Sequence, residues 1–166
     1  MPWVWISIGS NQDRDRCIRG SVAQLQARFG PLRLSPVYES DPVGFQGQPF
    51  YNLVAGFACD WELSDLLALL RALEDEFGRE RQGPKFSPRT LDLDLLTYGD
   101  QVVDRGPVRL PREEITRYAF VLRPLADVAG DECHPLLGTS YGALWAEFDA
   151  SAQPLRPIAF WQDIPS

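Results

Sequence analysis

The sequence has 166 residues, of which 45% are hydrophobic and 23% are charged, values typical of one soluble globular domain. A chain of this length buries roughly two-thirds of its unfolded surface, so it needs no disulfides or structural metal in order to fold. The net charge of −7 argues against general nucleic-acid binding, but it allows a local basic cluster to bind an anionic substrate.

The N-terminal half of the chain predicts three strands and two helices. Residues 3–8 are apolar and rich in β-formers, which indicates a buried strand. Apolar side chains recur at helical spacing over residues 13–29, and Gly30 ends that helix. The following segments predict a second strand, a loop rich in glycine and proline, a third strand and a second helix with Ser64 as its N-cap, at residues 32–38, 40–49, 51–59 and 65–77.

The C-terminal half predicts a strand followed by additional elements. A basic loop leads into a strand at residues 90–98, after which residues 101–110 predict a short hairpin. Helices are predicted at 118–128, where Pro124 should kink or end the helix, and at 139–148. The tail from Ser151 is expected to be irregular. The order βαββαβ predicts an α+β fold, a ferredoxin-like sandwich with a mostly antiparallel sheet, in one domain over residues 1–166.

The cysteines and apolar segments indicate a cytoplasmic protein without a membrane span. Cys17, Cys59 and Cys133 are widely spaced and lack a CxxC pattern, so we interpret them as reduced packing residues. The first residues lack the basic region and cleavage site of a signal peptide. No apolar segment approaches the roughly 20 residues that a membrane span requires.

The most specific motif, residues 88–96, reads PRTLDLDLL. Because side chains alternate along a strand, Asp92 and Asp94 should share one face while the neighbouring leucines share the other. Two carboxylates roughly 7 Å apart along a strand repel each other unless a cation lies between them. Mg²⁺ prefers one or two carboxylates together with phosphate oxygens, so the pair predicts a magnesium site. The alternative is a sheet face that only contacts water.

The loop before this motif concentrates positive charge in an acidic chain. Its four basic residues are Arg79, Arg81, Lys85 and Arg89. Arginine binds phosphate in a bidentate manner and lysine acts as a point charge. Taken alone, the loop is better explained as solvated surface charge, but its position beside paired carboxylates favours a mobile lid over ATP.

Aromatic and amide side chains form a third group. Tyr38, Phe50 and Tyr51 lie near Asn52, and such side chains at a sheet edge can stack on a flat heterocycle and bond its edge. The alternative is that these aromatic residues belong to the core, as aromatic residues in strands usually do.

Together these motifs resemble the 6-hydroxymethyl-7,8-dihydropterin pyrophosphokinase family of folate synthesis, along most of the chain. The family signature is an arginine, two residues, and then Asp-apolar-Asp-apolar-apolar, preceded by proline, and residues 88–96 match it without a gap. Weaker matches follow in the expected order at residues 6–11, 38–40, 44–52, 78–81 and 119–126, together with Glu74.

The resemblance implies an enzyme that transfers pyrophosphate from ATP to the hydroxymethyl group of the dihydropterin and releases AMP. It implies that Asp92 and Asp94 hold a pair of Mg²⁺ ions and that they act in catalysis with Arg79 and Arg89. ATP would be bound by a group of mostly basic residues, namely Glu74, Arg81, Lys85, Arg89 and Arg112.

On the pterin side, the resemblance implies a ring sandwiched between Phe50 and Phe120. Asn52 would bond the edge of the pterin, and the backbone near Ser40 and Val43 would assist. The implied partners are small molecules only, ATP and the hydroxymethyl-dihydropterin, with no nucleic acid and no membrane, and we expect a monomer.

The chain departs from the family pattern at two positions near the ATP site. Arg112 stands where the family commonly has histidine, and Tyr118 stands where it commonly has arginine, although Arg117 lies one residue earlier. Arg112 can still donate to a phosphate. The only histidine, His134, is out of register and is expected at the surface.

These departures leave two alternatives to an active pyrophosphokinase. One is a divergent paralogue that acts on a modified pterin or binds pterin with weak or no transfer. The other is a ferredoxin-like RNA-binding module, against which the pI near 4.7 and the paired aspartates both argue.

Overall fold

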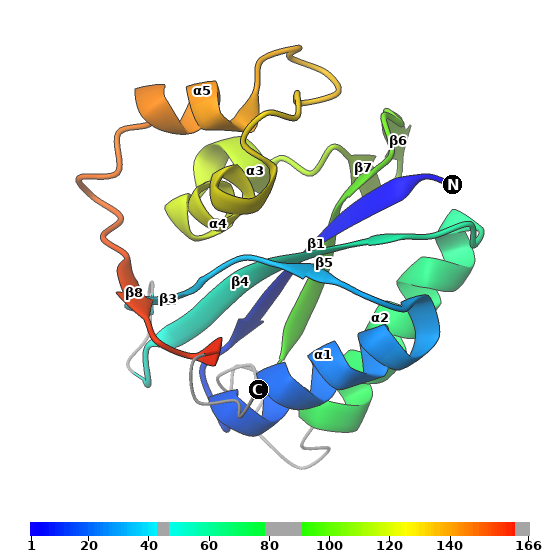
Figure 1. Cartoon of the computed structure of the whole chain (residues 1–166), viewed down its shortest axis with the longest axis horizontal. Coiled ribbons are helices and arrows are strands. Elements are labelled where there is room, and N and C mark those ends of the chain that lie inside the picture. The colour runs from blue at the N-terminus through cyan, green and yellow to red at the C-terminus, as the bar shows by residue number, and fades with distance from the viewer. Residues whose placement is uncertain (43–46, 79–90, 162–166) are drawn as a thin grey trace.

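A central sheet lies between two layers of helices (Figure 1). The computed structural model describes residues 1–42, 47–78 and 91–161. Within this part of the chain, every helix is too short or too polar to cross a membrane.

The sheet has six strands, and all of its pairings are antiparallel. Its main path runs β5-β1-β4-β3-β8, and β2 also pairs with β4. The order of the first four strands on this path is that of a ferredoxin-like fold, so the predicted α+β class is confirmed. The strands are β1 (Trp3–Ser10), β2 (Arg33–Leu34), β3 (Val37–Ser40), β4 (Phe50–Ala58), β5 (Asp92–Tyr98) and β8 (Arg156–Ile158).

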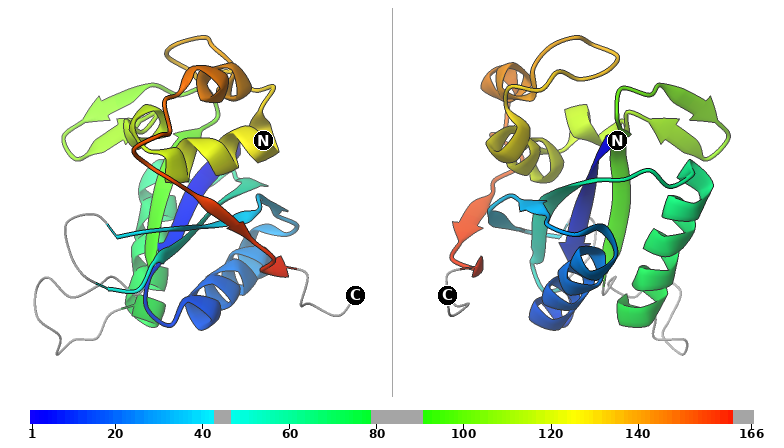
Figure 2. Two further views of the ribbon diagram at one scale, coloured as in Figure 1. Left: turned by 90° about the vertical axis from the view of Figure 1, so that its left-hand side faces the viewer. Right: turned by 45° about the vertical axis from the view of Figure 1, so that its right-hand side comes forward.

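One face of the sheet is covered by α1 (Arg14–Phe29) and α2 (Leu63–Gly78) (Figure 2). Alternate residues of β1 and β5, such as Ile6 and Leu93, pack with these helices in a buried apolar cluster. The two helices approach closely where Gly20 of α1 faces Phe77 of α2. A Cβ at position 20 would lie only 2.3 Å from the Phe77 ring, so glycine permits this contact. We call this side the core face.

The opposite face is covered by α3 (Glu114–Arg117), α4 (Ala119–Ala129) and α5 (Tyr141–Glu147). Trp5 of β1 packs there with Val121 and Leu125 of α4. The hairpin β6 (Val103–Arg105) and β7 (Val108–Leu110) precedes α3 and confirms the short hairpin predicted at residues 101–110. We call this second side the cavity face.

The structure corrects three local predictions and part of a fourth. The predicted second strand is divided into β2 and β3, because Pro36 has no N–H to donate to a neighbouring strand. Ser64 lies inside α2 and is not its N-cap. Pro124 lies inside α4 and does not end it, because the helix continues to Ala129 while burying Leu122 and Leu125. The tail expected to be irregular contains β8, which pairs with β3.

Two polar residues near the end of the chain also differ from expectation. His134 is buried, and its Nδ1 accepts hydrogen bonds from the backbone N–H groups of Leu136 and Leu137 at 3.2 and 3.1 Å. Burial lowers the pKa of His134. All three cysteines are free, but only Cys17 and Cys59 are buried packing residues, whereas Cys133 is exposed.

Candidate active site

A cavity of about 830 Å³ opens on the cavity face of the sheet. Its size suits one or two small organic molecules. Strands β1, β3, β4 and β5, the segment around α3 and α4, and residues before β8 all contribute to the lining, which consists of Ser7, Gly9, Ser40, Asp41, Pro42, Phe50, Asn52, Asp92, Asp94, Leu96, Arg112, Glu114, Tyr118, Phe120, Val121, Ala152, Gln153, Pro154 and Leu155.

The strand register explains why these residues meet. Gly9 of β1 is paired with Asn52 of β4 on one side and with Asp92 of β5 on the other. Ser7 of β1 is paired with Asp94 in the same way. Because residues two apart on a strand share a face, the aspartates and Asn52 line the same cavity.

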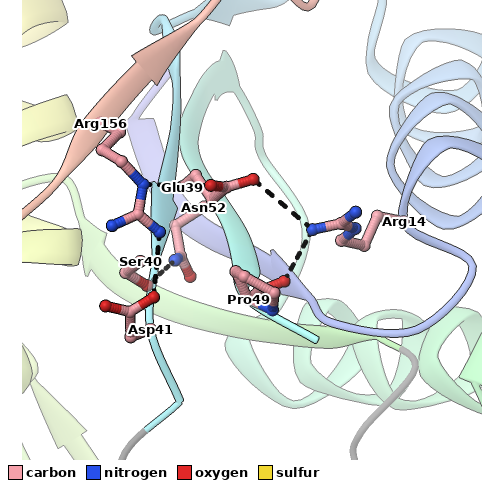
Figure 3. A network of polar contacts seen from close by, with 7 residues as sticks. All are labelled: Arg14, Glu39, Ser40, Asp41, Pro49, Asn52 and Arg156. Carbon is pink, nitrogen blue, oxygen red and sulfur yellow. Dashed lines mark hydrogen bonds and ion pairs between the residues drawn. The ribbon is translucent and has the colours of Figure 1, made fainter. Parts of the chain in front are cut away.

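Gly9 also has a steric role at the centre of this row. A Cβ at Gly9 would lie 2.9 Å from the Oδ1 atom of Asn52, closer than a real side chain allows. The Asn52 side chain is buried and donates from Nδ2 to Ser40 Oγ at 3.0 Å (Figure 3). The glycine therefore makes room for an amide whose orientation is set by β3.

The paired aspartates line the cavity and are half-buried. The leucines that alternate with them, Leu91, Leu93 and Leu95, are buried in the core face, as the strand pattern predicted. Arg112 holds a guanidinium nitrogen 3.4 Å from Asp94 Oδ1 and also forms an ion pair with Glu114. The negative charge of this pair is thus partly balanced by a cation of the chain itself.

This donor set fits magnesium. Among the described residues, no cluster of three or more acidic, histidine or cysteine side chains could form a complete metal cage. Mg²⁺ does not need one, because it takes one or two carboxylates and completes its shell with phosphate oxygens and water. Asp92 and Asp94 supply those carboxylates at a cavity that has room for a polyphosphate.

Aromatic side chains also line the cavity. Phe50 is the first residue of β4, and Phe120 lies in the first turn of α4. Both contribute to the cavity wall, and Phe120 stacks on Tyr118 with ring centroids 5.1 Å apart. Tyr118 is 40% exposed, so the two rings present an aromatic surface to a ligand.

The remaining aromatic candidates serve the core. Tyr38 is buried, and its hydroxyl donates to Asp127 of α4. Burial and this hydrogen bond raise the pKa of Tyr38 to about 12. Tyr51 points to the core face, where it packs beside Phe160 and under the guanidinium of Arg14.

Some predicted site residues lie elsewhere. Glu74 is in α2, and its Oε2 accepts a hydrogen bond from the backbone N–H of Leu93 at 2.9 Å, so it contacts β5 from the core face. Arg117 is exposed and pairs with Glu113 at 3.4 Å. The other predicted residues, Val43, Arg79, Arg81, Lys85 and Arg89, lie outside the described residues.

Sequence reasoning missed the contribution of the C-terminal segment. Ala152, Gln153, Pro154 and Leu155 all line the cavity. They carry no charge and belong to no recognisable motif, so no local signal could have identified them. Glu114 also lies in the cavity wall, where it forms an ion pair with Arg112.

The fold and the cavity together define a small α+β protein in which one cavity combines paired carboxylates with aromatic side chains. Residues 5–130 match the family model described as 7,8-dihydro-6-hydroxymethylpterin-pyrophosphokinase (HPPK). The chain belongs to this family.

Individual relatives agree with this assignment. The chain is 40% identical to the 2-amino-4-hydroxy-6-hydroxymethyldihydropteridine pyrophosphokinase of Pseudomonas aeruginosa, with 77% of this chain and 81% of that protein covered. It is 34% identical to the protein of the same name from Bacillus subtilis, covering 75% and 77% of the two chains.

Longer proteins also match. The folic acid synthesis protein fol1 of Pneumocystis carinii is 32% identical over 95% of this chain, which spans only 22% of that protein. A crystal structure of an HPPK-DHPS protein from Plasmodium falciparum has a TM-score of 0.71 at 11% identity, covering 88% of this chain and 41% of that one. At this identity, the structural similarity shows the fold alone.

Proposed function

We infer that the chain transfers pyrophosphate from ATP to the hydroxymethyl group of 6-hydroxymethyl-7,8-dihydropterin and releases AMP. One observation carries the inference: a single cavity joins the paired carboxylates of β5 to Phe50, Phe120 and Asn52. Family membership and the names of the relatives support the same reaction.

The pterin is proposed to bind between Phe50 and Phe120, because a flat ring gains most from stacking on aromatic faces. The amide of Asn52, held by Ser40, would bond the ring edge. A ring fixed in this way is proposed to place its hydroxymethyl group in the same cavity as Asp92 and Asp94.

Asp92 and Asp94 are proposed to hold a pair of Mg²⁺ ions. When bound, the metal would neutralise the ATP phosphates and polarise the β-phosphoryl group. Arg112 lies beside Asp94 and can donate to a phosphate oxygen. Arg79, Arg81, Lys85 and Arg89 are proposed as further phosphate ligands.

In the proposed reaction, the hydroxymethyl oxygen attacks the β-phosphorus of ATP. The bond from that phosphorus to the oxygen bridging the α- and β-phosphates breaks, and AMP leaves with that oxygen. Arg112 is always protonated, so it cannot accept the hydroxyl proton, which must pass to a carboxylate or to solvent. Positioning and charge neutralisation supply most of the acceleration in such transfers.

The proposal extends to a cytoplasmic monomer that acts on two small molecules. Size-exclusion chromatography with light scattering should give a mass near 18.7 kDa.

The direct test measures AMP formed from ATP and Mg²⁺ with and without 6-hydroxymethyl-7,8-dihydropterin. We expect AMP to form only when the pterin is present. If no AMP forms while calorimetry still detects pterin binding, the chain is a pterin-binding paralogue with weak or no transfer, and the proposed reaction is wrong.

A further inference from the structure

We propose that residues 152–158, which we call the C-terminal strap, position the pterin-binding part of the cavity and set its affinity for the pterin. This inference rests on the proposed function. Figure 1 shows the chain leaving α5 and descending along one side of the molecule to β8, which lies beside β3. The family model matches residues 5–130, so the strap lies beyond it.

The first part of the strap is a wall of the cavity. Residues 152–155 line the same cavity as Phe50, Phe120 and Asn52. Pro154 restricts the backbone of this wall, because its ring fixes one of the two soft backbone angles. A ligand bound between the two phenylalanines would therefore lie in a space that the strap helps to bound.

Gln153 attaches the strap to the start of α4. Its Oε1 accepts a hydrogen bond from the backbone N–H of Ala119 at 2.8 Å, and its Nε2 donates to the backbone carbonyl of Arg117 at 3.1 Å. These two bonds hold the residues on either side of Tyr118. Ala119, one of the two, immediately precedes Phe120. The side chain also satisfies an N–H group in the first turn of α4, which has no partner within the helix.

Arg156 attaches the strap to the end of β3 (Figure 3). Its Nε donates to Glu39 Oε1 at 3.1 Å, and another guanidinium nitrogen donates to Asp41 Oδ1 at 3.0 Å. Ser40 lies between these two acidic residues and accepts the hydrogen bond that orients Asn52. Arg156 therefore holds both neighbours of the serine that supports the pterin-binding amide.

A second arginine completes this network on the β4 side. Arg14 of α1 donates to the backbone carbonyl of Pro49 at 2.9 Å and lies 3.8 Å from Glu39 Oε2 (Figure 3). Pro49 immediately precedes Phe50. Glu39 thus links two arginines, one holding the residue before Phe50 and the other belonging to the strap.

The ion pairs of Arg156 are too exposed to serve mainly as stabilisers of the fold. The side chain of Arg156 is 44% exposed and that of Asp41 is 65% exposed, and exposed pairs contribute little to stability. Their geometry nevertheless fixes the side chains around Ser40. We therefore expect the strap to affect substrate binding more than folding.

The test uses Gln153→Ala and Arg156→Ala in the full chain. Each variant removes hydrogen bonds on one side of the cavity. We therefore expect the KM for the pterin to rise roughly 10-fold, which corresponds to the loss of about one hydrogen bond to a charged group. The KM for ATP and kcat should stay within about twofold, as expected for lost ground-state binding. Calorimetry with 6-hydroxymethylpterin should show the same weakening of Kd.

Two further variants separate positioning from general damage. Arg156→Lys keeps the charge but not the bidentate geometry, so it should recover only part of the affinity. Arg105→Ala removes an exposed arginine from another three-residue strand, β6, and should leave pterin binding unchanged. Thermal unfolding of all four variants should match the parent within a few degrees.

The outcomes distinguish this proposal from the proposed function. If the parent neither binds nor converts the pterin, the proposed function is wrong and the role of the strap falls with it. If the parent is active but Gln153→Ala and Arg156→Ala bind pterin like the parent, only the strap proposal is overturned. Equal rises in the KM values for pterin and ATP would also overturn it.

Discussion

The two faces of the central sheet are built by the same strands but have different properties. On the core face, Ile6, Leu93 and Leu95 are almost completely buried against α1 and α2. On the cavity face, Asp92 and Asp94 are half-buried around an open space. Because successive side chains of β5 point to opposite faces, neighbouring residues contribute in turn to the stability of the fold and to the lining of the cavity.

The two faces also differ in how their side chains affect stability. The core face gains from burying apolar surface, at about 25 cal/mol per Å². The cavity face gathers Asp41, Asp92, Asp94 and Glu114, whose mutual repulsion lowers stability. Arg112 and Arg156 offset part of that repulsion. A residue on β5 should therefore affect either activity or folding, according to the face that it occupies.

The largest effect is expected for Asp92→Ala or Asp94→Ala. Either change removes a proposed metal ligand, and turnover should fall at least about 10³-fold, equivalent to about 4 kcal/mol of transition-state stabilisation. The melting temperature should stay the same or rise, because one of two repelling carboxylates is gone. Asp104→Ala, an exposed aspartate of β6, is the matched control and should keep full activity. Turnover within a few-fold of the parent would refute the metal assignment.

Leu93→Ala should have the opposite effect from its two neighbours. The side chain is 5% exposed in the core face, and removing it leaves a cavity that should lower the free energy of unfolding by about 2–5 kcal/mol. The remaining folded protein should turn over at close to the parent rate. Urea unfolding measures the loss, and Leu93→Met should lose less than about 1.5 kcal/mol. A large loss of kcat without a loss of stability would contradict the assignment of core-face residues to stability.

Phe120→Ala should act within the cavity face on one substrate only. Stacking of a base on an aromatic ring contributes about 1–3 kcal/mol, so the Kd for the pterin should rise roughly 5- to 150-fold. ATP binding should change little. Phe120→Trp keeps an aromatic face and should retain most of the affinity. Fluorescence titration with the pterin measures each constant, and equal weakening for both substrates would contradict the assignment.

The smallest effect is expected in the pH dependence of stability, through His134. The pKa of His134 is lowered by burial, so below about pH 6.5 the unfolded chain binds a proton that the folded chain does not. Stability should therefore fall as the pH drops from 7 to 5, and His134→Gln should reduce this slope. The chain has one histidine, which makes the comparison direct. An identical slope in the variant, measured by urea unfolding, would show that His134 does not titrate in this way.

Much of the fold could be predicted because its signals are local. The apolar segments and the helical spacing of residues 13–29 identified the main strands and helices, and the alternation of residues 91–95 placed the aspartates on one face. The division of the second strand at Pro36 was missed, since a short interruption barely changes the apolar pattern. His134 was misplaced because its partners are backbone groups, which leave no trace in the sequence.

The sequence by itself determined the βαββαβ order, the common face of Asp92 and Asp94 and the family, because strand alternation and a continuous motif act over a few residues. Only the tertiary structure decided which distant segments enclose the cavity. Strand register aligned Asn52 and Gly9 with Asp92, and Arg156 reached Asp41 across 115 residues of chain. Such contacts depend on how whole elements pack, and no local pattern encodes them.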